Sequence, residues 1–511
     1  ERTMTNSSFQ MQDGPLTTTA EARHVLEEIL GRPYVRRGLG WLSAPRTGKP
    51  TWFELLCANY DRRDASRWER VKWAFPSWLI SAGLKRARLD KEMMKKKLFH
   101  HRPTVRALSL TARSISKYGL TAPQRFAAPL FLVWNITRAC NLRCQHCYEN
   151  ATPKPEPGEL TLHQKLRVVD ELADEGVPFL AIAGGEPLVC PDLWAVLHRA
   201  SERGIHLTVA TNGTMLTPRN MERLMKAGVK YVEVSIDSLD PREHDEFRGH
   251  PGAWAKSIEG IKNSVAAGMR TGMAMCFTRK TVDRADEAVQ MAIDLGCQTF
   301  SHFNFIPVGR GREVMDYDLT PAQREKLLKV LFRRLQEGQI NVISTAPQFA
   351  RTCVMHGTAE SLYATGHAGS GQGTKTMVLS RYVGGCGAGR CYCSIQPNGD
   401  VTPCVYVPGV TIGNLKTRRF GEIWDCGLFA TLSSRAGLGG HCGTCGYQAY
   451  CGGCRARALA YTGDIRHGDP GCGFNERLWS EMAQEKARED LVQIGASFAA
   501  VARQRAGGAA L

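Results

Sequence analysis

Short apolar runs alternate with helix-periodic segments through the middle of the chain. Each of six apolar runs of strand length precedes a longer segment with apolar residues at helical spacing. This alternation predicts an α/β fold with a parallel sheet and helices outside it, and six units fit a partial (β/α)6 TIM-like barrel better than a closed eightfold one. Its active site is expected at the C-terminal strand ends. The expected strands are Leu130–Ile136, Pro178–Ala183, His206–Ala210, Tyr231–Ile236, Thr271–Phe277 and Thr299–Ile306, and the expected helices cover about 161–176, 191–203, 217–227, 254–268, 281–295 and 320–336.

The segments on either side of this region have different compositions, which predicts separate domains. The front is basic, helix-prone and rich in Trp, whereas the C-terminal part is dense in Gly and Cys and has little room for a conventional core. The expected divisions are a helical N-terminal region over 1–128, the partial barrel over 129–340, a linker over 341–379, a small cysteine-rich domain over 380–475, and a C-terminal helix and tail over 476–511.

Charge is concentrated near the front of the chain, which has a formal net charge of +17 overall. Residues 61–105 contain thirteen Lys or Arg and five Asp or Glu, interleaved with Trp68, Trp73 and Trp78. Such a segment either binds an anionic membrane surface or belongs to a helical layer that packs on the barrel and turns its charged face to solvent. Nucleic acid is a weaker candidate, since no recognised binding module surrounds the basic residues.

Cysteine usage indicates metal binding in a reducing compartment. Most of the eighteen cysteines fall in two tight groups with metal-ligand spacing, so disulfides are the weaker interpretation. No run of residues has the length and apolarity of a membrane span, and residues 1–14 lack a secretory-signal pattern. We therefore expect a cytoplasmic protein, with peripheral membrane attachment as an alternative.

The first cysteine group has the spacing Cys140-x3-Cys144-x2-Cys147 and directly follows the first expected strand. Three closely spaced thiolates can bind three irons of a [4Fe–4S] cube and leave the fourth iron open for a small ligand. The alternative is zinc, which in structural sites takes four ligands, and His146 is poorly placed as the fourth.

This loop, with an adjacent aromatic residue, resembles the hallmark of the radical S-adenosylmethionine (SAM) superfamily. Each further motif alone is compatible with an ordinary tight turn, but several at successive strand ends are hard to produce by chance. The further motifs are Gly184-Gly185-Glu186-Pro187, Thr211-Asn212-Gly213, Ser235-Ile236-Asp237 with His244-Asp245 and Arg248-Gly249, and Ile306-Pro307-Val308-Gly309-Arg310-Gly311.

The resemblance implies which residues contact SAM. The segment beginning at Gly184 is expected at the methionyl amino group, and Ser235 and Arg248 at the ribose and carboxylate. The glycines are expected to let the backbone approach a ligand closely. The full set that the resemblance implies is Tyr148, Gly184, Gly185, Glu186, Pro187, Asn212, Ser235, Asp237 and Arg248.

The second cysteine group resembles the SPASM extension found behind some radical SAM barrels. It implies one auxiliary [4Fe–4S] cluster on Cys386, Cys391 or Cys393, Cys404 and Cys454, and another on Cys442, Cys445, Cys451 and Cys472. Nine cysteines for eight positions leave one spare, either Cys391 or Cys393. Only two residues separate Cys451 from Cys454 where the family has three, and a pair of zinc knuckles is the alternative.

The resemblance also implies the chemistry. A reduced cluster cleaves SAM to a 5′-deoxyadenosyl radical that abstracts hydrogen from a substrate, and the auxiliary clusters are expected to transfer electrons. An external one-electron donor of the flavodoxin or ferredoxin type is the expected partner. No catalytic acid–base residue is assigned, and Val405 stands where sulfatase-maturing relatives have Asp. The expected substrate is a peptide or protein side chain, with a tetrapyrrole or membrane lipid as the alternative. A non-catalytic iron–sulfur carrier or scaffold is the alternative of another class.

Overall fold

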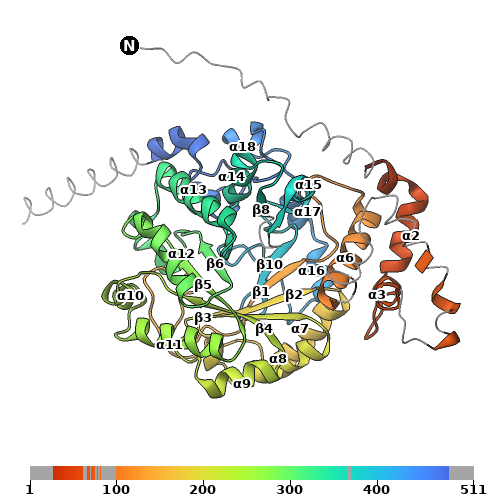
Figure 1. Ribbon diagram of the computed structural model, residues 1–511, viewed down its shortest axis with the longest axis horizontal. Helices are drawn as coiled ribbons and strands as arrows, with labels where there is room; N and C mark the ends of the chain where they lie inside the picture. Colours follow the sequence, from red (N-terminus) through yellow and green to blue (C-terminus); the bar gives the residue numbers. More distant parts are fainter. Residues whose placement is uncertain are drawn as a thin grey trace, which may run out of the picture.

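One open sheet organises most of the chain. The computed structural model describes residues 27–60, 66–68, 71–74, 77–78, 81, 99, 101–364 and 370–482. Ten strands form the sheet in the order β12-β11-β10-β1-β2-β3-β4-β5-β6-β7, with helices around its outside (Figure 1). The eight strands from β10 to β7 are parallel, and β11 and β12 pair antiparallel at one edge.

The predicted partial barrel is confirmed, and each expected strand and helix overlaps an observed one. The strands are β1 (Phe131–Asn135), β2 (Phe179–Ala183), β3 (His206–Thr211), β4 (Val229–Ser235), β5 (Arg270–Cys276) and β6 (Thr299–Phe303). The helices after them are α7 (Leu162–Asp174), α8 (Leu193–Glu202), α9 (Pro218–Lys226), α11 (Ala253–Ala266), α12 (Ala285–Asp294) and α13 (Pro321–Glu337), and the short helix α10 (Pro241–Arg248) was not expected.

The segment 341–379, predicted as a linker, contains secondary structure. Strand β7 (Asn341–Ser344) adds a seventh parallel strand beside β6, because its four residues continue the strand–helix alternation. Helix α14 (Gln348–His356), the hairpin β8 (Leu362–Ala364) with β9 (Ser370–Gln372), and helix α15 (Gly373–Val383) follow.

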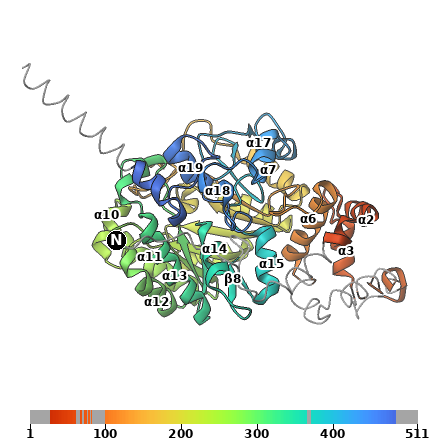
Figure 2. The ribbon, with the colours of Figure 1, turned by 90° about the horizontal axis from the view of Figure 1, so that it is seen from above.

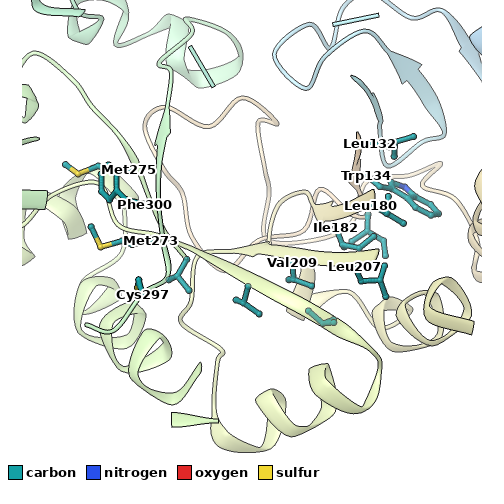
Figure 3. Packing of buried hydrophobic residues seen from close by; sticks show 14 of the residues in the cluster. Leu132, Trp134, Leu180, Ile182, Leu207, Val209, Met273, Met275, Cys297 and Phe300 are labelled. Atoms are coloured by element: carbon teal, nitrogen blue, oxygen red, sulfur yellow. The ribbon is translucent and has the colours of Figure 1, made fainter. Parts of the chain in front are cut away.

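Alternation along the strands separates the core from the barrel interior. On β1 to β3, Leu132, Trp134, Leu180, Ile182, Leu207 and Val209 are fully buried and belong to one cluster with the surrounding helices (Figure 3). Successive strand residues point to opposite faces, so the residues between them face the barrel interior. These are small or polar at the strand ends, as at Ala183, Ala210 and Ser235. The alternation therefore leaves space inside the barrel at the C-terminal ends of the strands.

The described part of the N-terminal region is helical and lies at one end of the molecule (Figure 2). It comprises α2 (Pro33–Ser43), α3 (Trp52–Ala58), which begins with a capping box between Thr51 and Glu54, and α6 (Arg102–Tyr118). Arg113 of α6 donates to the carbonyl of Glu175 at 2.7 Å, which attaches this layer to the barrel. Most of the basic run 61–105 lies outside the described residues. In the described part, no helix combines the length and apolarity needed to cross a bilayer.

The cysteine-rich C-terminal region continues the barrel sheet. Its strand β10 (Tyr392–Ile395) pairs with β1, and β11 (Asp400–Thr402) and β12 (Gly413–Asn414) complete the sheet. Four short helices follow: α16 (Phe420–Trp424), α17 (Gly427–Ser433), α18 (Gly440–Thr444) and α19 (Arg455–Thr462). A fully buried guanidinium, that of Arg457, donates to Asn304 Oδ1 and to the carbonyl of Phe305, both at 2.7 Å. These bonds attach α19 to the segment that follows β6.

Candidate functional site

A cavity of about 150 Å³ lies at the C-terminal ends of the barrel strands, where the barrel geometry predicts an active site. Its wall combines residues of the cysteine loop, residues that end successive strands and one residue from the C-terminal region. The wall includes Cys140, Cys144, His146, Cys147, Tyr148, Gly184, Gly185, Asn212, Glu233, Ser235, Asp237, Arg248, Cys276, Asn304, Phe305, Arg310 and Tyr406.

The three cysteines of the first group lie together in this wall, and each sulfur accepts one hydrogen bond. The N–H of Leu142 donates to Cys140 Sγ at 3.4 Å, the N–H of Ala151 donates to Cys147 Sγ at 3.4 Å, and Arg248 Nη1 donates to Cys144 Sγ at 3.7 Å. Burial raises the pKa of Cys140 to about 12, so the free thiol stays protonated at neutral pH. A bound metal must therefore displace a proton from this sulfur, and the donors favour the thiolate that results.

The glycines after β2 contact the cysteine loop. Gly185 donates to the carbonyl of Thr137 at 2.8 Å. A Cβ atom at Gly184 would lie 2.5 Å from the oxygen of Thr137, and one at Gly185 would lie 2.1 Å from the oxygen of Ala139. Both glycines also line the cavity. Because these glycines have no side chain, the backbone of the cysteine loop can pack directly against them. The sequence predicted only that the glycines let a ligand approach.

Glu186 and Pro187 do not line the cavity, in contrast to the other residues predicted to contact SAM. The buried carboxylate of Glu186 accepts hydrogen bonds from Thr211 Oγ1 at 2.7 Å, the N–H of Asn212 at 2.8 Å and the N–H of Leu188 at 3.1 Å. These bonds fasten the end of β2 to the turn after β3. Glu186 therefore positions Asn212, which lines the cavity.

A buried ion pair lies beside the cysteine loop. Arg248 Nη2 is 2.6 Å from Asp237 Oδ2, and Asp237 Oδ1 accepts the N–H of Cys276 at 3.0 Å. His146 Nε2 lies 3.5 Å from Asp237 Oδ2, and its ring stacks on Phe247 with centroids 4.4 Å apart. Burial lowers the pKa of His146 to about 4, so this ring is neutral at neutral pH. The fixed charges here are those of Arg248 and Asp237.

Two tyrosines form the side of the cavity that faces the C-terminal region. Tyr148 follows Cys147 directly, and its hydroxyl donates to Asn135 Oδ1 at 3.1 Å. Its ring meets the ring of Tyr406 edge to face, with centroids 5.2 Å apart. Tyr406 lies two residues after Cys404. The contact therefore joins the first cysteine group to the second.

Several cavity residues were not assigned from the sequence. Glu233 of β4 accepts from the hydroxyls of Ser301 and Tyr231, and burial raises the pKa of this carboxyl. An acid between the two valines Val232 and Val234 of an expected strand was a usable signal for it. Arg310 Nε donates to the carbonyl of Cys144 at 2.9 Å and stands in the Ile306–Gly311 motif. Cys276 and Asn304 had no such signal, because their importance depends on strand ends that only the fold brings together.

The cysteines of the second group separate into two neighbourhoods. Burial raises the pKa of Cys391, Cys404 and Cys454, and the nearby thiol of Cys386 raises each of them further. These four therefore lie close to one another. In the other neighbourhood, burial raises the pKa of Cys451, with Cys472 and Cys442 adding to the effect. Cys445 follows α18 directly, three residues after Cys442.

Cys393 is apart from both neighbourhoods. It lies on β10 opposite Leu132 of β1, is 0% exposed and belongs to the apolar core of the barrel. Burial alone raises the pKa of its thiol, with no contribution from another cysteine. By contrast, Cys391 is half-buried and adjoins Cys386. The environments thus distinguish the two cysteines that the sequence left as alternatives.

The surroundings of the first cysteine group bear on the zinc alternative. His146, which lies between two of these cysteines in the sequence, faces Asp237 and stacks on Phe247. A zinc ion requires its ligands around a single point, whereas each thiolate of a [4Fe–4S] cube can bind a different iron. Sets of soft thiolates with backbone N–H donors suit an iron–sulfur cluster.

Comparison with known proteins extends this interpretation. A model described as the radical SAM superfamily matches residues 134–292, and one described as the SPASM iron–sulfur cluster-binding domain matches residues 386–455. The AdoMet-dependent heme synthase of Methanosarcina barkeri is 34% identical over 68% of this chain and 96% of its own length. The mycofactocin maturase MftC of Mycobacterium tuberculosis is 31% identical over 68% of this chain and 83% of its own length.

The fold also matches a solved structure. Streptococcus suis SuiB bound to the precursor peptide SuiA has a TM-score of 0.59 over 83% of this chain and 93% of that one. The two sequences are 18% identical, so the likeness is one of fold.

Proposed function

The chain belongs to the radical SAM superfamily and is an enzyme of its SPASM type, with a SAM-binding [4Fe–4S] cluster and auxiliary iron–sulfur ligation, and from this premise we propose its reaction and ligands. Cys140, Cys144 and Cys147 hold the SAM cluster. When bound, the cluster and SAM supply a 5′-deoxyadenosyl radical, made by reductive cleavage, that abstracts hydrogen from the substrate. The observation that carries this proposal is the convergence of three thiols, each with its own N–H donor, on one cavity at the strand ends.

The surrounding residues bind and orient the ligands. Arg248 keeps a positive charge beside Cys144, which favours the negative charge of a ligating thiolate and of a carboxylate on the open iron. Gly184 and Gly185 leave room for that ligand next to the loop. Tyr148 and Tyr406 cover the side toward the C-terminal region and exclude water from it.

Two auxiliary [4Fe–4S] clusters complete the proposal. One would be ligated by Cys386, Cys391, Cys404 and Cys454, and the other by Cys442, Cys445, Cys451 and Cys472. Full cysteine ligation leaves no open iron for substrate, so these clusters transfer electrons. An external one-electron donor of the flavodoxin or ferredoxin type supplies the reducing equivalents.

Iron content and SAM cleavage test the assignment together. Three [4Fe–4S] clusters correspond to about twelve irons per chain. Replacing Cys140, Cys144 and Cys147 together with Ala should leave about eight and abolish release of 5′-deoxyadenosine from SAM. The matched triple variant at Cys442, Cys451 and Cys472 should also lose about four irons but still cleave SAM. A reduced, fully loaded wild-type protein that releases no 5′-deoxyadenosine would instead favour a non-catalytic electron carrier.

For the substrate, we infer a carboxylate-bearing tetrapyrrole in preference to a peptide. The relative with 34% identity over nearly its whole length is named a heme synthase. A second hollow, of about 260 Å³, adjoins the first across Tyr148. Its lining includes Arg312, Glu149 and Arg138, which is paired with Glu149 and Glu156. Aromatic walls and arginines suit a flat, apolar ring with carboxylate substituents. The described part of residues 1–128 has helices α2, α3 and α6 and no strand to which an extended peptide could add.

Titration with coproporphyrin, a tetrapyrrole with four carboxylates, tests this choice. The expected result is a shift of its Soret absorption on binding, with an affinity about fivefold weaker in Arg312→Ala, because an exposed charge-assisted pair contributes about 1 kcal/mol. The exposed residue Arg333 on the outer face of α13 gives a control in Arg333→Ala, which should leave binding unchanged. Saturable binding of a peptide substrate with no porphyrin binding would support the second candidate, which the likeness to mycofactocin maturase MftC favours.

We infer a cytoplasmic location, because oxygen-sensitive thiolate clusters require a reducing compartment. Contact of residues 61–105 with an anionic membrane remains part of the proposal. Trp68 and Trp78, two described residues of this segment, are 85% and 62% exposed. Binding to vesicles of anionic lipid, lost on deletion of residues 1–105, tests that contact, and equal sedimentation with and without vesicles would contradict it.

A further inference from the structure

A barrel arginine reaches one of the auxiliary cysteines. Arg351 lies on α14, and its Nη1 donates to Cys472 Sγ at 3.1 Å. Its side chain is 1% exposed. Among the described residues, neutral groups also donate to auxiliary sulfurs: the amide of Asn475 donates to Cys442 Sγ at 3.7 Å, and the hydroxyl of Tyr392 bonds to Cys404. The contact of Arg351 is therefore distinguished from these two by its charge.

Two further contacts hold the guanidinium in place, and a third holds Glu325. Arg351 Nη2 pairs with Glu325 Oε1 of α13, and its central carbon lies 4.5 Å from the ring centre of Phe474. Glu325 Oε1 also accepts the N–H of Gly473 at 3.3 Å. Two barrel helices, α13 and α14, thus contact Cys472 and the two residues that follow it. These contacts fix both the position of Cys472 Sγ and the position of the guanidinium charge that faces it.

The charge of Arg351 persists at every accessible pH. An arginine guanidinium is not deprotonated in proteins, and this one lies between Cys472 and Glu325. As a free thiol, Cys472 is a neutral and weak acceptor. A cluster thiolate is a negatively charged acceptor, which a buried guanidinium prefers.

We propose that Arg351 sets the reduction potential of the auxiliary cluster that Cys472 ligates, shifting it upward so that this cluster accepts an electron more readily. The inference rests on the proposed function, which supplies the cluster. Reduction adds one negative charge to a cluster that is already anionic. A fixed positive charge and an N–H···S hydrogen bond both stabilise the reduced form, so both raise the potential. Arg351 is in this sense a positioning and tuning residue, because it contacts a ligand and not the substrate.

Two substitutions with opposite expected signs test the proposal. Arg351→Met removes the charge and the hydrogen bond with little change in length, and it should lower the midpoint potential of one auxiliary cluster. Glu325→Gln leaves the guanidinium without its counter-charge and should raise the same potential. Both are made in the chain with Cys140, Cys144 and Cys147 replaced by Ala, so that a redox titration followed by electron paramagnetic resonance sees only auxiliary clusters. The signal that Cys472→Ser perturbs identifies the cluster concerned.

Iron content separates failure of this inference from failure of the proposed function. About eight irons per chain in the background variant support the auxiliary clusters, and about zero would overturn the proposed ligation itself. With eight irons present, potentials unmoved by both substitutions would overturn the role of Arg351. Equal shifts in the potentials of both auxiliary clusters would overturn it as well, since they would indicate a general change in the electrostatic potential of the protein and not a specific contact with Cys472. Arg333→Met, an exposed change on α13, should move neither potential. If Arg351→Met fails to fold, Glu325→Gln alone tests the proposal: a higher midpoint potential supports it, and an unchanged or lower one overturns it.

Discussion

Arg248 contacts Asp237 and Cys144 through the two arms of one guanidinium. Nη2 lies 2.6 Å from Asp237 Oδ2, and Nη1 donates to Cys144 Sγ at 3.7 Å. Burial lowers the pKa of Arg248, but Asp237 and Cys144 together raise it by more, so the net pKa lies above the usual range. In the same way burial raises the pKa of Asp237, whereas Arg248 and His146 lower it, with a net decrease. The pair therefore keeps a positive charge directed at a predicted cluster ligand.

This geometry predicts that Arg248→Lys impairs SAM cleavage more than cluster assembly. Lysine retains the charge but cannot contact Asp237 and Cys144 at once, because its single ammonium lacks the planar fork. Loss of such an outer contact to a metal ligand typically costs about 10–100-fold in activity. We expect a fall of that size in 5′-deoxyadenosine release, with iron content unchanged at about twelve per chain. A loss of iron equal to that of the triple cysteine variant would mean that Arg248 is needed for assembly.

The two candidate spare cysteines should respond differently to the same change. Cys391→Ala removes a predicted ligand and should lower the iron content toward about eight per chain. Cys393→Ala removes a sulfur from a fully buried position beside Leu132, so it should leave the iron content at the wild-type level. The small cavity should lower the free energy of unfolding by about 1 kcal/mol, measurable as a lower melting temperature. The reverse pattern of iron contents would exchange the two assignments.

Glu186 is predicted to act on stability as well as on SAM binding. Glu186→Ala leaves the N–H groups of Asn212 and Leu188 and the hydroxyl of Thr211 without their acceptor, and unsatisfied buried donors cost about 1–3 kcal/mol each. We expect a clear drop in melting temperature, together with a weaker affinity for SAM because Asn212 shifts. Thermal unfolding and SAM binding by calorimetry measure the two effects. Weaker SAM binding with unchanged stability would instead indicate a direct contact between Glu186 and SAM.

His302 predicts a dependence of stability on pH. It is fully buried on β6, its Nδ1 lies 2.9 Å from Ser344 Oγ, and burial lowers its pKa to about 3, with Arg324 and Arg457 adding to the effect. Because the folded pKa is below the unfolded value of about 6.5, the stabilisation is present above that value and is lost as the pH falls toward 3. From pH 7.5 to 5.5 the loss should be about 1.4 kcal/mol. Denaturant titration of wild type and His302→Gln measures it, and equal losses in both would contradict the assignment to His302.

The barrel was predictable because its signals are local and repeat. Each strand from Leu130 onward is an apolar run, and each following helix shows 3.6-residue periodicity, so the alternation identified six units. The short strand Asn341–Ser344 lacked a long apolar run and stood in a segment treated as a linker. The pairing of β10 with β1 joins residues about 260 positions apart, and no local pattern encodes such a partner.

The candidate site likewise contains residues that the sequence predicted and features that it did not. Cys140, Cys144 and Cys147 were identified by spacing, and they do line one cavity. The location of Glu186 outside that cavity could not be predicted, because a motif identifies a segment and not the direction of each side chain. The choice between Cys391 and Cys393 depended on register. Strand pairing with β1 directs Cys393 into the core, whereas Cys391 precedes the strand.

The narrow space between Gly185 and the cysteine loop gives a prediction about the role of that glycine. An added Cβ would lie 2.1 Å from the oxygen of Ala139 and 2.7 Å from that of Arg138, which are backbone atoms and cannot rotate away. Gly185→Ala should therefore push the loop that bears Cys140 out of place, with lower iron content and at least a tenfold loss of SAM cleavage, as for other disturbed ligand shells.

A matched substitution separates this effect from the general cost of adding a methyl group. Gly38 lies inside α2, and a Cβ there would meet no atom within 4 Å. Gly38→Ala should leave iron and activity unchanged and stabilise the helix by about 0.5–1 kcal/mol, since alanine loses less conformational entropy on folding. Iron content, 5′-deoxyadenosine release and melting temperature of the two variants measure the contrast. Full iron content and activity in Gly185→Ala would show that the loop can yield, and the glycine would then be explained by ligand approach alone.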